Sequence, residues 1–315
     1  VFSIITGAVI LDSRLSGGGE HKVDDFDWLG AALSSFALVA LLLGMTAGSR
    51  IGWMSPAVIV ALFSFLVTLG AFAWWELRVS SPMLDIRLFQ IKLFFTGTTA
   101  GWLSFLGTQP VRFLMPFYLQ FVLGYSPATI GWIIVPSAFC MVLVGPLSGR
   151  LSDRYGWRFF NVGGLVVSAV GLLILCTVDI NSSLALAMVG MIIQTLGFGA
   201  FWPPNNSSVL SVVDEERYGV VSAFMNLVRN SGNVIGIAVS TAIVTATMGS
   251  MGYPATLAVI EQTNDMGLLN SFTIGLRMAF AFSVGFVLIG AVLSVFKGAK
   301  REDILLNGDA ACDHS

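Results

Sequence analysis

Residues 149–158 read Gly149-Arg150-Leu151-Ser152-Asp153-Arg154-Tyr155-Gly156-Trp157-Arg158, and they stand between two long apolar runs. Three arginines and one carboxylate are concentrated in this short basic loop, which has a glycine near each end. Membrane proteins place an excess of Lys and Arg in the cytoplasmic links between their spans. The stretch therefore predicts a tight transmembrane hairpin that closes on the cytoplasmic side.

The composition of the whole chain agrees with a membrane protein. Of the 315 residues, 56% are hydrophobic and only 11% are charged. In soluble domains about a quarter of all residues are charged, so this composition excludes an ordinary soluble domain. The net charge of −2 excludes a basic protein that binds nucleic acid. The three cysteines form no framework and the two histidines match no metal-ligand spacing, so we expect no metal and no other cofactor.

Eight apolar runs are long enough to cross a bilayer, which takes about 20 residues per helix. They cover residues 28–47, 53–75, 94–121, 128–148, 159–178, 183–209, 218–248 and 271–296. The runs are too long for strands and show no alternation of polar and apolar residues. The predicted fold class is an all-α, polytopic membrane protein.

The positions of the basic residues test this count of spans. With residues 149–158 inside the cell, the cytoplasmic segments hold twelve of the 16 Lys and Arg residues and the outer links hold only Arg50. The remaining three, Arg112, Arg229 and Arg277, fall within spans. Because this split follows the positive-inside rule, we expect a multi-pass protein of the bacterial cytoplasmic membrane with a cytoplasmic carboxy terminus.

The order of the spans divides the chain into four segments. Residues 1–11 lie in an apolar run without an initiator methionine, and we expect them to end an upstream helix of a missing amino-terminal half. Segment 12–92 contains a cytoplasmic stretch, a central transmembrane hairpin and a polar connector. Segment 93–298 contains six spans, and 299–315 is a polar cytoplasmic tail.

Further motifs surround the basic loop. Before it stand Pro116-Phe117-Tyr118-Leu119-Gln120-Phe121-Val122-Leu123-Gly124-Tyr125-Ser126-Pro127, then Gly131, Pro136 and Gly145-Pro146. Asp27-Trp28-x-Gly30 stands near the start, and Arg229-Asn230-Ser231-Gly232-Asn233-x-x-Gly236-x-Ala238 follows the loop. With the pattern G-x-L-x-D-R-x-G-x-R, they resemble the fourteen-helix drug/proton antiporter branch of the major facilitator superfamily.

The resemblance implies a fold and an activity. It implies a six-helix carboxy-terminal transporter bundle preceded by an extra two-helix hairpin. It also implies proton-coupled efflux of amphipathic organic compounds by alternating access, with the bilayer, a small organic solute, protons and the missing half as partners. The proton-handling carboxylate of the family belongs to that missing half, and all 18 acidic residues here fall in loops or at span ends.

The resemblance also gives the basic loop a role, as a conformational gate that clamps one half of the transporter against the other. The gate residues are Gly149, Arg150, Asp153, Arg154, Gly156 and Arg158. Asp153 lies near the start of the next helix, where a carboxylate meets the positive end of the dipole. The alternative is that the charges of the loop only set the topology.

Polar side chains within spans are costly in a bilayer and mark candidate functional positions. In residues 94–121 they recur on one face, and we expect Pro110 and Pro116 to break the helix there, as Pro203 and Pro204 break span 183–209. The candidate substrate cavity consists of Gln109, Arg112, Tyr118, Gln120, Gln194, Trp202 and Asn205. The alternative for these residues is helix–helix packing unrelated to a solute.

A second polar patch, in the cytoplasmic half of span 218–248, consists of Asn226, Arg229, Asn230 and Asn233. We expect it to make interhelical hydrogen bonds or to form a gate. No phosphate loop, metal cluster or nucleophile–base pair supports an enzyme. Two further functions stay open: a facilitator-type transporter of another solute, such as an amino acid, siderophore or lipid-linked compound, and a non-transporting membrane sensor or truncated product.

Overall fold

The computed structural model describes residues 27–51, 55–79, 86–213, 217–254, 256–257 and 265–296. Within these ranges the chain is helical and contains no strand, so the predicted all-α class is confirmed. The expected upstream helix end at 1–11 and the tail at 299–315 lie outside the described residues.

Eight long helices occupy the described ranges, and each overlaps one predicted span. They are α2 (Trp28–Ile51), α3 (Pro56–Glu76), α4 (Lys92–Phe117), α5 (Pro127–Tyr155), α6 (Trp157–Leu175), α7 (Leu184–Leu210), α8 (Tyr218–Ser250) and α9 (Met266–Val295). A short 3₁₀ helix, η2 (Ile86–Gln90), precedes α4, and a π-helical turn, η3 (Tyr118–Val122), follows it.

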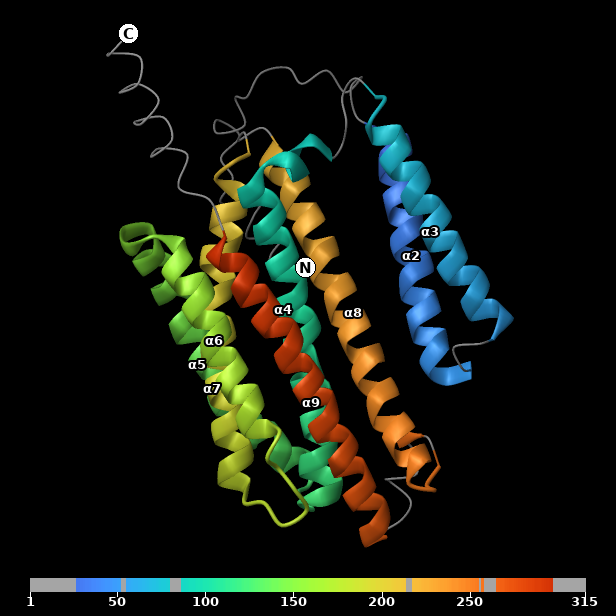
Figure 1. Ribbon diagram of the computed structural model, residues 1–315, viewed down its shortest axis with the longest axis vertical. Helices are drawn as coiled ribbons and strands as arrows, with labels where there is room; N and C mark the ends of the chain where they lie inside the picture. Colours follow the sequence, from blue (N-terminus) through green and yellow to red (C-terminus); the bar gives the residue numbers. More distant parts are fainter. Residues whose placement is uncertain are drawn as a thin grey trace, which may run out of the picture.

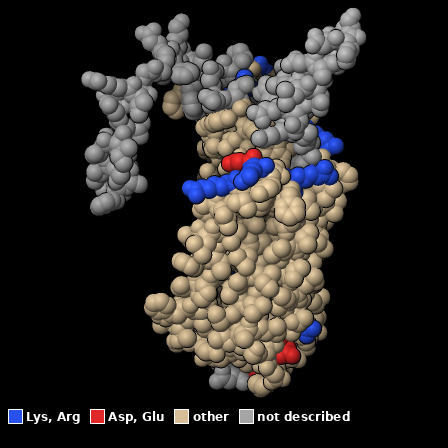
Figure 2. Space-filling model, turned by 90° about the vertical axis from the view of Figure 1, so that its left-hand side faces the viewer, with Lys and Arg blue, Asp and Glu red and all other residues tan. Residues whose placement is uncertain are grey.

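Six of the described helices, α3 and α5 to α9, are long and apolar enough to cross a membrane. Helix α4 is not among them, because threonines, glycines, Gln109 and Arg112 interrupt its apolar sequence. On the face shown in Figure 2, most Lys and Arg side chains gather in the upper part of the molecule, and a long, largely uncharged surface separates them from one basic side chain near the lower end. The chain is therefore a multi-pass integral membrane protein.

The helices form a six-helix bundle with a hairpin beside it (Figure 1). In the bundle, α4 packs against α7, α8 and α9, while α6 packs against α7 and α9. Helix α5 lies on α7, and the α2–α3 hairpin contacts the bundle through α8. Helix α4 is thus surrounded by protein on three sides, which explains how a less apolar helix is accommodated within the bundle.

Glycines bring the backbones of α6 and α7 together. A Cβ added at Gly164 would lie 2.7 Å from the backbone nitrogen of Phe201. A Cβ at Gly171 would collide with the backbone of Gln194, and one at Gly197 with the backbone of Ser168. Because lipid supplies no hydrophobic drive between helices, such small residues allow the close van der Waals contact that holds them together.

The prolines do not break the helices, contrary to the sequence prediction. Helix α7 continues through Pro203 and Pro204. A proline lacks the amide hydrogen, so Pro203 leaves the carbonyl of Gly199 without its helical donor. The hydroxyl of Ser148 on α5 lies 3.1 Å from that carbonyl oxygen and can donate to it. The same hydroxyl lies 2.9 Å from the carbonyl oxygen of Gly145 in its own helix, so its single hydrogen is shared between two acceptors, one of them on the neighbouring helix.

Helix α4 likewise continues through Pro110 and Pro116. Pro110 frees the carbonyl of Leu106, and α8 approaches that carbonyl so closely that a Cβ at Gly236 would lie 2.7 Å from its oxygen. After Pro116 the helix widens into the π turn η3. The local change is therefore a widened turn at the end of α4, and a discontinuous helix is not observed.

Candidate functional site

The predicted basic loop is almost entirely helical. Helix α5 continues to Tyr155 and α6 begins at Trp157, so Gly156 alone joins them. The φ angle of Gly156 is +85°, a left-handed conformation that a side chain with a Cβ rarely adopts. The predicted tight hairpin is thus present, and its basic side chains lie on the last turns of α5 and the first turn of α6.

The charged side chains of this segment point away from the protein. Arg150, Asp153, Arg154 and Arg158 are all exposed. Asp153 lies three residues before the capping glycine, where the dipole of its own helix α5 disfavours a negative charge. Within the ranges described, no ion pair is formed by Asp153 with any of the arginines. Its carboxylate is therefore available to a group outside the bundle.

Three of the predicted cavity residues lie in the helix packing instead. Tyr118 has 0% exposure, and its hydroxyl donates to the backbone carbonyl of Asp179 at 2.7 Å. Asn205 also has 0% exposure, and its Nδ2 donates to the carbonyl of Gly97 at 3.1 Å. Gln194 is 3% exposed. A side chain without exposed surface offers none to a solute, so the packing alternative describes these three residues.

The other four predicted cavity residues keep accessible surface. Gln109, Gln120 and Trp202 are partly exposed, and Arg112 is exposed. From α4, the Nη2 atom of Arg112 lies 3.4 Å from the Sδ atom of Met141 on α5. The guanidinium carbon lies 5.9 Å from the centre of the Phe198 ring on α7. Arg112 therefore joins three helices at one point.

An aromatic cluster adjoins Arg112. The ring of Phe105 on α4 lies edge-on to Trp202 at 4.7 Å and to Phe198 at 5.3 Å, measured between ring centres. Phe198 and Trp202, one turn apart on α7, are stacked at 6.4 Å. The two phenylalanines are buried and Trp202 is partly exposed. These three rings, here called the aromatic wall, therefore pack on one another with Trp202 alone partly accessible, and the Arg112 guanidinium lies beside Phe198.

Helical spacing predicted the separate faces of α4 and α7, but it did not predict how they meet. The contribution of Met141 from α5 was missed, because an apolar residue in an apolar span gives no sequence signal. The meeting of Arg112 with Phe198 was missed for a related reason, since contacts between helices depend on their rotation and depth in the bundle.

The second polar patch lies on α8 and faces outward. Asn226, Arg229 and Asn230 are exposed. Asn226 donates from Nδ2 to the carbonyl of Ser222 in its own helix at 3.2 Å, and the buried Oδ1 of Asn233 has no hydrogen-bond partner. In the part of the chain that the structure describes, these four side chains make no hydrogen bond to another helix, so the predicted interhelical bonds are not observed.

Comparison with known families accords with this architecture. The family model described as Major Facilitator Superfamily matches residues 28–237 and, in a second placement, residues 93–306. The chain belongs to the Major Facilitator Superfamily. Because the members of this family are transporters, the chain is not an enzyme.

Similar proteins carry drug-resistance names. The "Lincomycin resistance protein LmrB" of Listeria monocytogenes is 26% identical over 270 residues, which cover 86% of this chain and 56% of that protein. The "Multidrug resistance protein Stp" of Mycobacterium tuberculosis is 33% identical over 221 residues, 70% of this chain and 41% of Stp. The "Riboflavin transporter RibZ" of Clostridioides difficile is 31% identical over 180 residues, 57% of this chain and 39% of RibZ.

The chain therefore spans about half the length of the curated relatives that it matches. The names of LmrB and Stp confirm the resemblance to the drug-efflux branch of the superfamily that the sequence motifs indicated.

Proposed function

We propose that this chain forms the carboxy-terminal half of a secondary active transporter that exports amphipathic organic compounds in exchange for protons. Its membership of the superfamily and the drug-resistance names of two relatives support this activity. Alternating access requires a second bundle, which we assign to an amino-terminal half of the same protein. The location that we propose is the bacterial cytoplasmic membrane, with a cytoplasmic carboxy terminus.

The position of Arg112 is the observation that carries the proposal. It lies ten residues before the end of η3, roughly 15 Å along the helix at 1.5 Å per residue. An exposed guanidinium at that depth is costly against lipid and must face water, a solute or protein. Within the described ranges no carboxylate pairs with it. Its proposed partner is a carboxylate of the second half or an anionic group of the solute.

The aromatic wall suits a large solute that needs few directional contacts. Partly exposed Trp202 presents a ring to stacking and dispersion contacts, and the buried phenylalanines hold that ring in place. Gln109 and Gln120 add a small number of hydrogen-bonding groups. Binding sites for organic molecules commonly combine such an apolar lining with a few polar groups.

The exposed basic residues favour a second candidate, a transporter of another solute. Arg112 and Arg229 are both exposed within their helices, and no carboxylate accompanies either one in the described segments. An arginine without a carboxylate partner favours a solute with an anionic group over a cationic drug. The relative named as a riboflavin transporter is consistent with such a difference in substrate.

Substitution of Arg112 in the full-length transporter tests the proposed site. We expect Arg112→Ala to reduce efflux at least about tenfold while membrane abundance stays near normal, because a charge-assisted contact of about 1.5–3 kcal/mol is lost. Arg112→Lys should rescue poorly if a planar, forked contact is needed. Efflux and abundance are measured together across external pH.

The matched control is Arg78→Ala. This residue lies just after α3, with its guanidinium carbon 4.2 Å from the centre of the Trp74 ring, far along the chain from the aromatic wall. The control should transport normally. If both Arg112 variants show normal efflux at every pH, Arg112 is not part of the proposed substrate site. A fall of abundance in step with efflux would make its role structural.

A further inference from the structure

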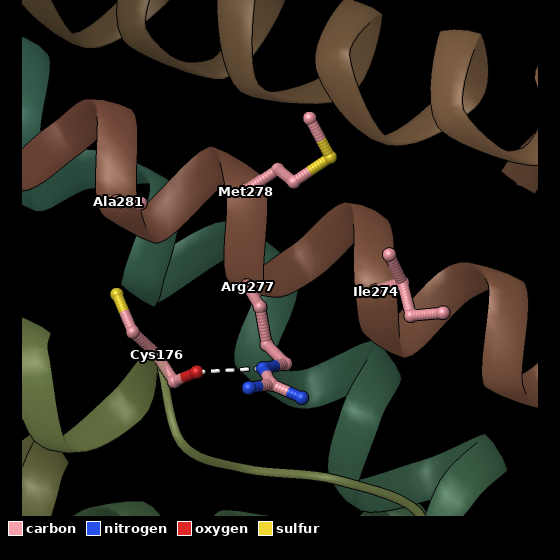
Figure 3. Close-up of a pocket in the computed structure, with 5 residues that line it drawn as sticks. All are labelled: Cys176, Ile274, Arg277, Met278 and Ala281. Atoms are coloured by element: carbon pink, nitrogen blue, oxygen red, sulfur yellow. Dashed lines mark hydrogen bonds between the residues drawn. The ribbon is translucent and has the colours of Figure 1, made fainter.

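A recess between α6 and α9 takes no part in the proposed transport. It is lined by Cys176, Ile274, Arg277, Met278 and Ala281 and has a volume of about 340 Å³ (Figure 3). Cys176 caps the carboxy-terminal end of α6, and the other four residues lie on α9. The recess therefore lies where α6 ends and α9 continues past it.

The surface of α9 that continues from the recess is apolar and exposed. Met278, Phe282 and Ile289 follow one another along this side of the helix, each with about half of its surface accessible. On the neighbouring helix, Leu173 is similarly exposed close to the end of α6. Side chains of this kind on a membrane-spanning helix contact acyl chains, so the recess opens toward lipid.

Arg277 is the charged group of this recess. Its Nε atom donates to the carbonyl oxygen of Cys176 at 2.7 Å, which satisfies one of the carbonyls left open at the end of α6. The two Nη nitrogens extend beyond that bond (Figure 3). In the segments that the structure describes, no other hydrogen bond and no ion pair engages the guanidinium.

Asp179, three residues after Cys176, uses its carboxylate for hydrogen bonds within its own loop. The Oδ1 atom of Asp179 accepts from the backbone nitrogen of Asn181 at 2.8 Å and from the hydroxyl of Ser182 at 3.0 Å. In the described segments the guanidinium forms no ion pair with Asp179 and keeps its Nη donors beside the carboxy-terminal end of α6. Arginine side chains can extend along apolar surface to place their charge among lipid headgroups.

We propose that the recess binds the phosphate of an outer-leaflet phospholipid. The anchored Nε of Arg277 fixes the plane of the guanidinium, and its Nη groups present paired donors that match two phosphate oxygens. The acyl chains then lie along the exposed apolar side of α9. This site is separate from the transport activity and does not depend on it.

Native mass spectrometry of the full-length transporter in detergent, titrated with phosphatidylglycerol, tests the site. Arg277→Gln removes the charge but keeps a side-chain donor for the Cys176 carbonyl, and it should weaken binding about tenfold. Ala281→Phe fills the recess without changing Arg277 and should also weaken binding. Arg78→Gln removes an exposed arginine elsewhere and should leave the tightest binding event unchanged.

Two further probes separate the phosphate from the rest of the lipid. Monogalactosyl diacylglycerol has acyl chains without a phosphate, and it should bind equally to the wild type and to Arg277→Gln. Inorganic phosphate in excess should not displace phosphatidylglycerol. Three results would each overturn the proposal. The wild type and Arg277→Gln would bind phosphatidylglycerol with equal affinity, or Arg277→Gln would lose as much affinity for the phosphate-free lipid as for phosphatidylglycerol. The third is complete displacement of phosphatidylglycerol by inorganic phosphate.

Discussion

The side of α7 that meets α6 and the side that meets α4 and α5 are built from different kinds of residue. Toward α6, Gly171 and Gly197 bring the two backbones into contact. Toward α4 and α5, Phe198 and Trp202 form the aromatic wall beside Arg112. One helix therefore has a side closed by backbone packing and a side on which the large ring of Trp202 stays partly accessible.

The difference shows how a transporter bundle can hold a polar and aromatic surface inside a membrane. Glycine contacts hold α6 and α7 through close packing and need no polar group. The opposite side of α7 then carries groups that are costly in lipid, such as the Gly199 carbonyl that Pro203 leaves without a helical donor. A hydroxyl from α5 lies within hydrogen-bonding distance of that carbonyl.

The largest effect is expected on the closed side. Gly171→Val would place side-chain atoms against the backbone of Gln194, which cannot move without separating the helices. Overpacking of this kind costs about 1–3 kcal/mol or more, so the abundance of the protein in membranes should fall sharply. Gly163→Val is the matched control, because a Cβ at Gly163 meets no atom within 4 Å. Equal abundance of the two variants would show that α6 and α7 can move apart at Gly171 without loss of the folded protein.

The next effect concerns the carboxy-terminal end of α5, a helix that packs on α7. Asp153→Asn should leave abundance intact, because an exposed carboxylate contributes little to stability. Transport by the full-length protein should slow about tenfold, since the charge is expected to favour one conformation. Initial efflux rates measure this. If Asp153→Asn transports at the wild-type rate, the charges of residues 149–158 only set the topology of the protein.

A smaller effect is expected on the aromatic wall. Trp202→Ala removes a ring that stacks on Phe198 and lies edge-on to Phe105. Aromatic contacts of about 0.5–1.5 kcal/mol should be lost, which corresponds to an efflux about fivefold lower for an aromatic solute. An aliphatic cation of similar size serves as the control solute. An equal loss for both solutes would assign the ring to packing.

The smallest effect is expected where α5 contacts α7. Ser148→Ala removes the hydroxyl that lies 3.1 Å from the Gly199 carbonyl, and the protein should lose about 1 kcal/mol of stability. Thermal unfolding of the purified protein measures the loss. Ser207→Ala, an exposed position on the same helix as Gly199, is the control. An unchanged midpoint for Ser148→Ala would mean that the carbonyl finds another donor.

For the described residues, the sequence by itself determined the number and order of the long helices and the class of the protein. Hydrophobic length and the placement of basic residues are local properties, so the eight long helices of the described ranges and the tight hairpin at 149–158 could be predicted without contacts. The end of helix α5, in contrast, could not be predicted from hydrophobic length. Apolar counting ended the span at Ser148, whereas α5 continues to Tyr155 because exposed charged residues can remain helical beyond the apolar layer.

Only the tertiary structure decided which polar residues are accessible. Gln194 and Arg112 both carry a polar group within an apolar helix, yet the first is buried in the packing and the second is exposed beside the aromatic wall. Pro203 predicted a break, yet α7 is continuous there, and the hydroxyl of Ser148 on α5 lies 3.1 Å from the Gly199 carbonyl that the proline leaves without a donor. The physical reason is the same in each case: the exposure and the surroundings of a polar group depend on how the neighbouring helices pack against it, and sequence periodicity does not contain those neighbours.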